Sequence, residues 1–369
     1  MKKIKISIIT VSYNSSNTIE QTIKSVISQT YNNVEYIIID GGSTDGTIDI
    51  IKRYESNISY WVSEKDYGIY DAMNKGVKKA TGDIVAFLNS DDYYIDSTAL
   101  ERVVACWNKY DKIDILAGRI AMYNQFSILC GYSPEVINLE QLCYRMILDH
   151  PAMFSRKKLF EEDGGFDLHY QIASDYAWVL KEYHMNRVIV SCQEVFTVFR
   201  LGGASSKITK KIALEVQDIT QNINPSYYYQ KYKNIIEDLY YNRQKQIERN
   251  NKIDEIILLN KNFAINKLDK ILETTKIAIW GYGAYGQECH EILERLGYKI
   301  NLIIDNDKNK WQDTDCIQIS GIDALEKFDG TVIISPSGHE KEIEEQMKYL
   351  TIRTVRYSEI LKVLNIDVL

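Results

Sequence analysis

Residues 34–47 read VEYIIIDGGSTDGT, an unbroken apolar run that ends in an acidic, glycine-rich turn. Two other stretches have the same design: residues 4–14 read IKISIITVSYN, and residues 82–92 read GDIVAFLNSDD. Runs such as Tyr36–Ile39 (YIII) do not alternate with polar residues, so both faces of those strands should be covered, as in a parallel sheet between helices. Polar and acidic side chains then collect at the carboxyl ends of neighbouring strands, where open α/β sheets bind their ligands.

Helical patterns separate these strands, which is the rhythm of β-α-β units. The first part of the chain predicts alternating strands and helices at Ile4–Val11, Thr18–Gln29, Val34–Asp40, Thr47–Tyr54, Ser59–Ser63, Ile69–Ala80 and Asp83–Leu88. From Asp96 to Leu201 the order is mixed, with strands expected at Ile113–Tyr123 and Arg187–Phe199 and helices near Leu139–Arg145 and Ser174–Met185. We therefore expect a Rossmann-like α/β domain over residues 1–205.

Residues 206–274 contain no glycine, and Ile, Leu and Tyr recur among many charges, which predicts a helical connector. Its apolar positions fit three arrangements: packing on its own domain, a helix hairpin, or the seam of a homo-oligomer. The run Tyr227–Lys233 (YYYQKYK) combines two residue types that suit the boundary between membrane and water. Peripheral membrane contact is therefore a further expectation.

Residues 275–369 predict a second, smaller Rossmann-like unit. Strand Ile277–Trp280 leads into the turn Gly281–Gly286 (GYGAYG), and a second strand ends at Asp305, the context of a dinucleotide fingerprint. A strand at Thr331–Ser335 and a helix at His339–Leu350 follow. Three interpretations stay open for this unit: a structural or oligomerising module, a nucleotide- or sugar-nucleotide-binding module, and a redox enzyme.

Composition narrows the class of protein. Of 369 residues, 45% are hydrophobic and 26% charged, as in soluble globular proteins. A net charge of −7 argues against nucleic acid as a partner, because a phosphate backbone calls for a basic face. Neither a signal peptide nor a membrane-spanning apolar run is apparent, so we expect a cytoplasmic protein or one on the inner face of the membrane. The six cysteines lack paired spacing, which favours reduced thiols over disulfides or zinc.

The acidic strand ends predict a metal-bound nucleotide. Mg²⁺ and Mn²⁺ prefer oxygen ligands, which Asp91 and Asp92 supply from the end of a rigid strand. Asp40 ends the neighbouring strand and is expected to accept hydrogen bonds from a base or ribose. The first strand adds the compact polar side chains of Thr10, Ser12 and Asn14. Taken singly, Asp-Gly and Ser-Asp-Asp are also common turn chemistry, and it is their coincidence at three strand ends that favours a binding site.

These stretches, together with residues 66–76 (DYGIYDAMNKG), Gly164–Asp167 (GGFD) and Ala173–Tyr176 (ASDY), resemble the family 2 glycosyltransferases. The resemblance covers roughly residues 4–205, with all motifs in the family's order. It implies a GT-A fold, an NDP-sugar donor, with UDP-sugar expected, an Mn²⁺ or Mg²⁺ ion, and inversion at the transferred sugar. The most similar members build bacterial surface polysaccharides, so the implied acceptor is a saccharide or a lipid-linked saccharide.

The resemblance also implies roles for individual residues on the donor side. The residues implied to bind the nucleoside are Thr10, Ser12, Asn14 and Asp40. Asp71 and Asn74 are implied to support the nucleotide or the sugar. Asn89-Ser90-Asp91 stands where the family usually has Asp-x-Asp. Asparagine carries no charge, so the metal contact is expected chiefly from Asp91, with Asp92 beside it and Asn89 facing the ribose or sugar.

Asp175 matches the position of the family's catalytic base, which removes the proton of the attacking acceptor hydroxyl. The alternative is that Asp175 merely favours the positive end of its helix. His150 is expected near the acceptor, or else buried in the fold. Trp178 is expected to stack on an acceptor sugar, or else to lie in the core. Arg200 begins the run Arg200–Ser205, which resembles the family's active-site flap, and is expected to meet the diphosphate.

The sequence thus predicts a metal-dependent glycosyltransferase of bacterial surface polysaccharide synthesis. Two other interpretations remain: an NAD-dependent oxidoreductase centred on residues 281–305, and a non-catalytic scaffold that binds nucleotide sugars.

Overall fold

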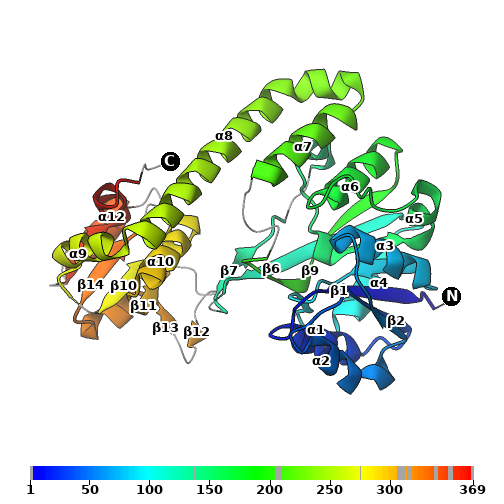
Figure 1. The fold of residues 1–369 in the computed structure, drawn as a ribbon, viewed down its shortest axis with the longest axis horizontal. Helices are drawn as coiled ribbons and strands as arrows, with labels where there is room; N and C mark the ends of the chain where they lie inside the picture. Colours follow the sequence, from blue (N-terminus) through cyan, green and yellow to red (C-terminus); the bar gives the residue numbers. More distant parts are fainter. Residues whose placement is uncertain are drawn as a thin grey trace. The chain divides into compact units, whose positions relative to one another are not determined.

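The computed structural model describes residues 3–125, 127–135, 138–203, 210–274, 276–305, 312–313, 318–335, 340–347 and 352–366. The chain divides into two compact units, Met1–Arg243 (unit 1) and Gln244–Leu369 (unit 2) (Figure 1). The boundary falls inside the long helix α8 (Ser226–Leu259). This division falls within residues 206–274, the segment predicted as a helical connector.

Unit 1 is built on a nine-stranded sheet with the order β3-β2-β1-β4-β8-β6-β9-β5, and β7 pairs with β6. Its strands are β1 (Ile6–Ser12), β2 (Val34–Asp40), β3 (Tyr60–Ser63), β4 (Ile84–Phe87), β5 (Tyr93–Tyr94), β6 (Ile115–Tyr123), β7 (Leu129–Tyr132), β8 (Met153–Arg156) and β9 (Ile189–Arg200). Its helices before α8 are α1 (Ile19–Ile27), α2 (Thr47–Arg53), α3 (Ile69–Lys79), α4 (Ala99–Trp107), α5 (Lys157–Asp163), α6 (Ser174–His184) and α7 (Lys210–Asn222). The segment 139–145, predicted as a helix, is a shorter 3₁₀ turn at Leu139–Cys143.

The connections of β1 position the site. β1 pairs in parallel with β2 on one side and with β4 on the other, so the chain reverses its direction of travel across the sheet at β1. The connections that leave β1 and β4 diverge there, which opens a crevice at the carboxyl ends of the strands. Ser12 lies in register with Asp40, so the polar ends of β1 and β2 are side by side, as the sequence predicts.

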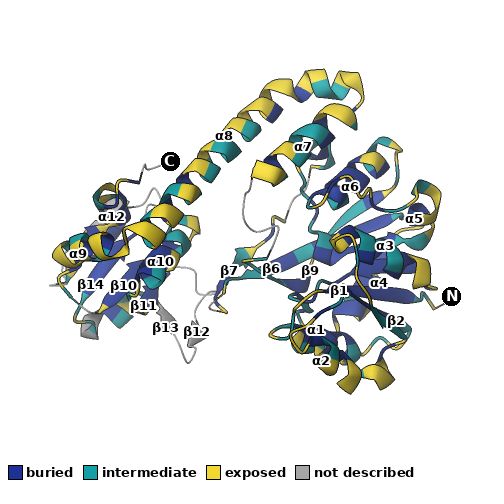
Figure 2. Cartoon of the chain, in the orientation of Figure 1, coloured by how far each residue is buried: buried dark blue, intermediate teal, exposed yellow. Residues whose placement is uncertain are grey.

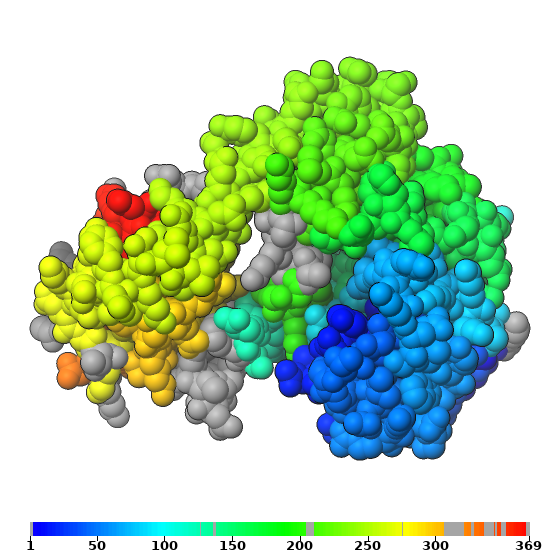
Figure 3. Space-filling view, viewed as in Figure 1, coloured from blue at the N-terminus to red at the C-terminus, as the bar shows by residue number. Residues whose placement is uncertain are grey.

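Apolar side chains cover both faces of this sheet, as expected from the unbroken hydrophobic runs. On one face Ile9 and Ile37 pack with residues of α3, α5 and α6, and on the other Ile8 and Ile38 pack with α1, α2 and α4. The strands β1, β2 and β4 are almost wholly buried (Figure 2). In the space-filling view the first hundred residues, in blue, pack directly against the later green segments of unit 1 (Figure 3).

Unit 2 contains a smaller sheet with the order β12-β13-β11-β10-β14-β15, parallel except at the pair β12 and β13. Its strands are β10 (Ile277–Trp280), β11 (Ile300–Ile304), β12 (Gln312–Asp313), β13 (Gln318–Ser320), β14 (Thr331–Ile334) and β15 (Arg353–Arg356). Its helices after α8 are α9 (Lys261–Leu272), α10 (Ala284–Leu296), α11 (Glu340–Met347) and α12 (Tyr357–Val363). The Rossmann-like unit is therefore confirmed. The ends of the predicted helix His339–Leu350 and Cys316 lie outside the described residues.

Two buried carboxyl groups meet between α5 and α6. Glu182 is fully buried and Asp163 nearly so, and Asp163 Oδ2 and Glu182 Oε1 each lack a hydrogen-bond donor. Burial, followed by the neighbouring Asp163, raises the pKa of Glu182 from its ordinary value of 4.5 to about 8, although Arg187 lies 3.1 Å away. A single proton shared between the two carboxyl groups would give both of these oxygen atoms a hydrogen-bond partner. We therefore expect the pair to hold one proton at neutral pH.

The free energy of unfolding should therefore fall as the pH rises from about 5 to about 8. The folded state binds the extra proton between the unfolded pKa of Glu182 and its folded value of about 8, so raising the pH across that range favours unfolding. Glu182→Gln supplies a permanent donor and should make the urea midpoint less dependent on pH between about 5 and 8. Glu162→Gln, on the exposed side of the same Arg187, is the matched control and should keep the wild-type profile. If the urea midpoints of wild type and Glu182→Gln changed equally with pH, the shared proton would be contradicted.

Candidate active site

A cavity of about 960 Å³ opens at the carboxyl ends of β1, β2 and β4 in unit 1. Its walls come from the turns after these three strands, from the start of α3, and from the segment that leads into α6. Seven of the residues predicted from the sequence line it: Ser12, Asn14, Asn89, Ser90, Asp91, His150 and Asp175. Residues more than 160 positions apart in the sequence therefore meet at one cavity.

The turn after β1 forms part of the cavity wall. Asn14 adopts a left-handed backbone conformation (φ +48°), and its Oδ1 accepts a hydrogen bond from the backbone of Thr44 at 2.9 Å. Between the two predicted residues Ser12 and Asn14 lies Tyr13, which lines the cavity and is 66% exposed. The sequence interpretation overlooked Tyr13, although an aromatic residue at the end of a buried strand is a signal for ligand contact.

Asp40 lies behind the cavity rather than on its surface. Its carboxylate is fully buried and accepts hydrogen bonds from the hydroxyls of Ser12, Ser43 and Ser63 and from the backbone N–H groups of Gly42 and Ser43. Burial alone would raise the pKa of Asp40, but these hydrogen bonds lower it overall, so the carboxylate is ionised at neutral pH. Asp40 thus shapes the turn whose Gly41 and Gly42 line the cavity.

Three other predicted donor-binding residues also lie outside the cavity lining. Thr10 is buried, and its Oγ1 accepts a hydrogen bond from Tyr36. Asp71 accepts the backbone N–H of Tyr67 at 3.1 Å and forms an ion pair with Lys75. Asn74 donates to the carbonyl of Phe166 at 2.9 Å and accepts the N–H of the same residue at 2.8 Å.

In contrast to Asp40 and these three residues, the turn after β4 presents polar atoms to the cavity. Asn89 Oδ1 is buried and has no hydrogen-bond donor, and Asp91 lies beside it in the lining. Burial raises the pKa of Asp91, and the charge of Arg200 opposes this shift. Both side chains place oxygen atoms at the cavity.

Asp92 differs from the expectation of a metal ligand. It is fully buried outside the cavity lining, and its Oδ1 accepts the backbone N–H of Arg200 at 3.1 Å. Burial and then the charge of Asp91 raise the pKa of Asp92 well above its ordinary range. Asp92 therefore anchors the end of β9, and the polar side chains of this turn that line the cavity are Asn89, Ser90 and Asp91.

The charge of the cavity lining favours a divalent cation with the ligand. Among the described residues, three carboxylates (Asp66, Asp91 and Asp175) but only one cationic side chain, Lys65, line the cavity. The negative charge of this cavity would repel a diphosphate that binds without a cation. The described residues contain no cluster of three or more His, Cys, Asp or Glu side chains fit to hold a metal. The donor set matches Mg²⁺ or Mn²⁺, which are commonly held by one or two carboxylates together with phosphates of the substrate.

Asp175 lies in the first turn of α6 and lines the cavity. The hydroxyl of Tyr70 lies 2.8 Å from Asp175 Oδ1 and 2.7 Å from the carbonyl oxygen of Ile172, and its single proton can be donated to only one of them at a time. Burial, and then the charge of Asp175, raise the pKa of Tyr70 well above its ordinary value, so the phenol stays protonated. Tyr70 was also overlooked in the sequence, because its contact with Asp175 joins positions far apart in the chain.

His150 lies within the same cavity lining. Its ring stacks on Phe87 with the centroids 5.3 Å apart, and its buried Nε2 has no hydrogen-bond partner. Burial lowers the pKa of His150, although the charge of Asp175 opposes this, so the ring is neutral at neutral pH. A neutral imidazole with an unused nitrogen suits a hydrogen bond to a ligand hydroxyl.

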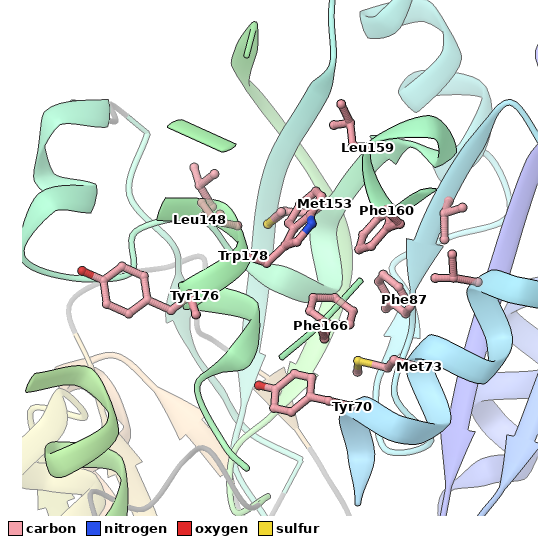
Figure 4. Packing of buried hydrophobic residues seen from close by; sticks show 14 of the residues in the cluster. Tyr70, Met73, Phe87, Leu148, Met153, Leu159, Phe160, Phe166, Tyr176 and Trp178 are labelled. Atoms are coloured by element: carbon pink, nitrogen blue, oxygen red, sulfur yellow. The ribbon is translucent and has the colours of Figure 1, made fainter. Parts of the chain in front are cut away.

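Of the two positions expected for Trp178, the structure shows the one in the core and not one that could stack on an acceptor sugar. It is buried and stacks face to face on Phe160 with the centroids 4.3 Å apart, next to Phe166 and away from the cavity lining (Figure 4). Trp178 lies one turn after Asp175 on α6, a helix that also buries Tyr176, Ala177, Val179 and Leu180. Trp178 is therefore a core residue.

Arg200 holds the turn after β4 from outside the cavity lining. Its guanidinium donates to the carbonyl oxygen of Asp91 at 2.5 Å and to Gln21, and it lies over the ring of Tyr93. It is not part of the cavity lining, whereas Gly203, in the predicted flap, is. Residues 204–205 of that flap lie outside the described residues.

Close packing of the backbone accounts for the glycines at positions 281 and 286 in the turn of unit 2. Gly281 has a φ of +86°, and a Cβ on Gly286 would lie 2.0 Å from the carbonyl oxygen of Gly281, so α10 packs directly on the turn. Asp305 Oδ2 accepts the backbone N–H of Tyr282 at 3.1 Å. The acidic residue of the fingerprint is thus bonded to its own glycine turn.

Within the described part of the chain, no helix has the length and apolar character required to cross a membrane.

Comparisons with known proteins agree with this geometry. A family profile described as "Glycosyl transferase family 2" matches residues 7–147. An uncharacterized glycosyltransferase of Mycobacterium tuberculosis is 33% identical over 178 residues, which are 48% of this chain and 68% of the relative. A PGL/p-HBAD biosynthesis glycosyltransferase of Mycobacterium bovis is 29% identical over 216 residues, or 56% of this chain and 80% of the relative.

Among solved structures, the S. aureus protein TarS (residues 1–349, in complex with UDP-GlcNAc) superimposes with a TM-score of 0.51 at 22% identity. The match covers 73% of this chain and 81% of TarS. This likeness concerns the fold alone.

Proposed function

The chain belongs to glycosyl transferase family 2, and we propose that it moves a sugar from a nucleoside-diphosphate donor to a saccharide or lipid-linked saccharide, with inversion. It is a glycosyltransferase with a GT-A fold, and the proposal concerns its substrates, its metal and its mechanism. The observation that carries the proposal is that the acidic turn after β4 and Asp175 line one cavity. That cavity is large enough for both a nucleotide sugar and part of an acceptor.

We assign the donor to the side of the cavity formed by the ends of β1, β2 and β4. Ser12, Tyr13 and Asn14 provide polar and aromatic contacts there, and Gly41 and Gly42 allow close approach to the backbone. Asp40, Thr10, Asp71 and Asn74 keep these walls in place through the hydrogen bonds described above. A UDP-sugar is the donor that the family resemblance favours.

We assign the metal site to Asp91, with Asn89 Oδ1 as a neutral second oxygen ligand. When bound, Mn²⁺ or Mg²⁺ would offset the charge that develops on the departing diphosphate. The acidic balance of the cavity lining and the unpartnered oxygen of Asn89 support this assignment. Arg200 contributes by fixing the backbone of Asp91 rather than by direct contact with phosphate.

Asp175 is assigned as the general base. The acceptor oxygen attacks the anomeric carbon and passes its proton to Asp175, while the bond from that carbon to the diphosphate oxygen breaks and its electron pair leaves with the diphosphate. One displacement from the face opposite the leaving group inverts the configuration. His150 is assigned to the sugar or the acceptor, because its buried Nε2 lacks a partner within the protein.

The proposal predicts turnover that depends on a divalent cation. A panel of UDP-, GDP- and dTDP-sugars, offered with saccharide and polyprenyl-linked acceptors, should yield nucleoside diphosphate for at least one donor. Addition of EDTA should abolish this release, and Mn²⁺ or Mg²⁺ should restore it. Release that persists in EDTA would contradict the metal, and a product that retains the donor's anomeric configuration in NMR would contradict inversion.

Asp175→Asn should lower kcat by about 10²–10⁴-fold, the usual contribution of a general base, while the Kd of the donor stays within twofold. The amide has nearly the same shape as the carboxylate but takes up no proton. Asp167→Asn, an exposed aspartate outside the cavity lining, serves as the control and should retain activity. Turnover of Asp175→Asn at the wild-type rate would remove Asp175 from this role.

Asp91→Asn should weaken donor binding in Mn²⁺ by about tenfold or more and leave the weak binding seen in EDTA unchanged. Calorimetric titration with the nucleoside diphosphate, with and without Mn²⁺, measures both values. Asp49→Asn, an exposed aspartate on α2, is the control for a general loss of charge. Equal strengthening of binding by Mn²⁺ in Asp91→Asn and wild type would exclude Asp91 as a ligand.

A further inference from the structure

α7 contacts the segment that carries the proposed base. Glu215, on α7, accepts hydrogen bonds from three successive backbone N–H groups, those of Gln171 (3.0 Å), Ile172 (2.9 Å) and Ala173 (3.0 Å). Carboxylate-to-amide bonds of this kind are among the stronger hydrogen bonds in proteins. Glu215 lies outside the residues matched by the family profile, which end at 147.

The three residues held by Glu215 belong to the cavity. Gln171 and Ile172 line it, and Ala173 is the N-cap of α6, two residues before Asp175. Glu215 accepts the N–H of the N-cap residue itself, the donor that a capping box satisfies with a Glu or Gln at the third helical position, which in α6 is Tyr176. From the other side, the carbonyl oxygen of Ile172 lies 2.7 Å from the hydroxyl of Tyr70, which also contacts Asp175.

We propose that Glu215 is a positioning residue for the transfer reaction, which holds the segment 171–173 so that Asp175 meets the acceptor hydroxyl. This inference rests on the proposed function of Asp175 as the base. Glu215 does not line the cavity and acts only through the backbone it binds. A second contact from the same helix, between Asp218 Oδ2 and the hydroxyl of Tyr170 at 2.7 Å, involves a single donor.

The difference between these two carboxylates defines the experiment. Glu215→Gln replaces one acceptor oxygen by an NH₂ group, which cannot accept the backbone N–H that it faces. Asp218→Asn is the matched control on the same helix, because its amide oxygen can still accept the hydroxyl of Tyr170, and the bond that it gives up, from the side chain of Asn222, is an exposed contact within α7. Glu215→Asp keeps the charge but shortens the reach by one methylene, and serves as a second variant if Glu215→Gln does not fold.

Glu215→Gln should lower kcat by about 10- to 100-fold, the cost of a small misplacement of a reacting group, with the KM of the donor within twofold of wild type. Hydrogen exchange by mass spectrometry should show faster exchange of the amides of residues 171–173 and unchanged exchange in β1 and β2. Asp218→Asn should match wild type in both measurements. Both readouts are taken well below the melting temperature of each variant.

A wild-type kcat in Glu215→Gln, accompanied only by a lower melting temperature, would overturn the positioning role, as would an equal loss of kcat in Asp218→Asn. Failure of the proposed function is a separate result, because it would appear as absent turnover in the wild-type enzyme. The exchange measurement does not depend on turnover, and unchanged protection of residues 171–173 in Glu215→Gln would overturn the inference by itself.

Discussion

The carboxylate of Asp40 organises the site of this glycosyltransferase. It accepts hydrogen bonds from the end of β1 (Ser12), from the turn after β2 (Gly42 and Ser43) and from the end of β3 (Ser63). A buried charge is tolerated only when it is paired or amply hydrogen-bonded, and five donors satisfy this requirement. Three strand ends are thereby fixed relative to one another by the protein alone, so the side of the cavity that we assign to the donor is preformed.

The two sides of the cavity are built differently. The donor side rests on parallel strands whose register is set by the hydrogen bonds of the sheet. The side that carries Asp175 rests on the segment before α6, which belongs to no strand and is held by side chains of α3 and α7. Side chains distant in sequence therefore determine the geometry of the proposed base.

The sequence was sufficient to predict the α/β fold, the strands β1 to β4 and the meeting of their acidic ends, because hydrophobic runs and turn residues are local signals. It did not distinguish residues that line the cavity from residues that support it. Asp40 and Asn89 both follow buried strands, but neighbouring serines surround Asp40 with donors, while Asn89 Oδ1 has none. Trp178 lies in the core because α6 is buried around most of its circumference by segments distant in sequence, which no local pattern reveals.

The hydroxyl of Tyr70 has a consequence for the proton that the reaction releases. Before the proposed reaction the phenol can donate to Oδ1 of Asp175, and the carbonyl of Ile172 lies within reach of the same hydrogen. In the proposed mechanism Asp175 takes up the acceptor's proton; it can then donate to the phenol oxygen, and the phenol can turn its own hydrogen to Ile172. The direction of the whole chain of hydrogen bonds reverses while every heavy atom stays in place, so both protonation states of the base have a satisfied partner.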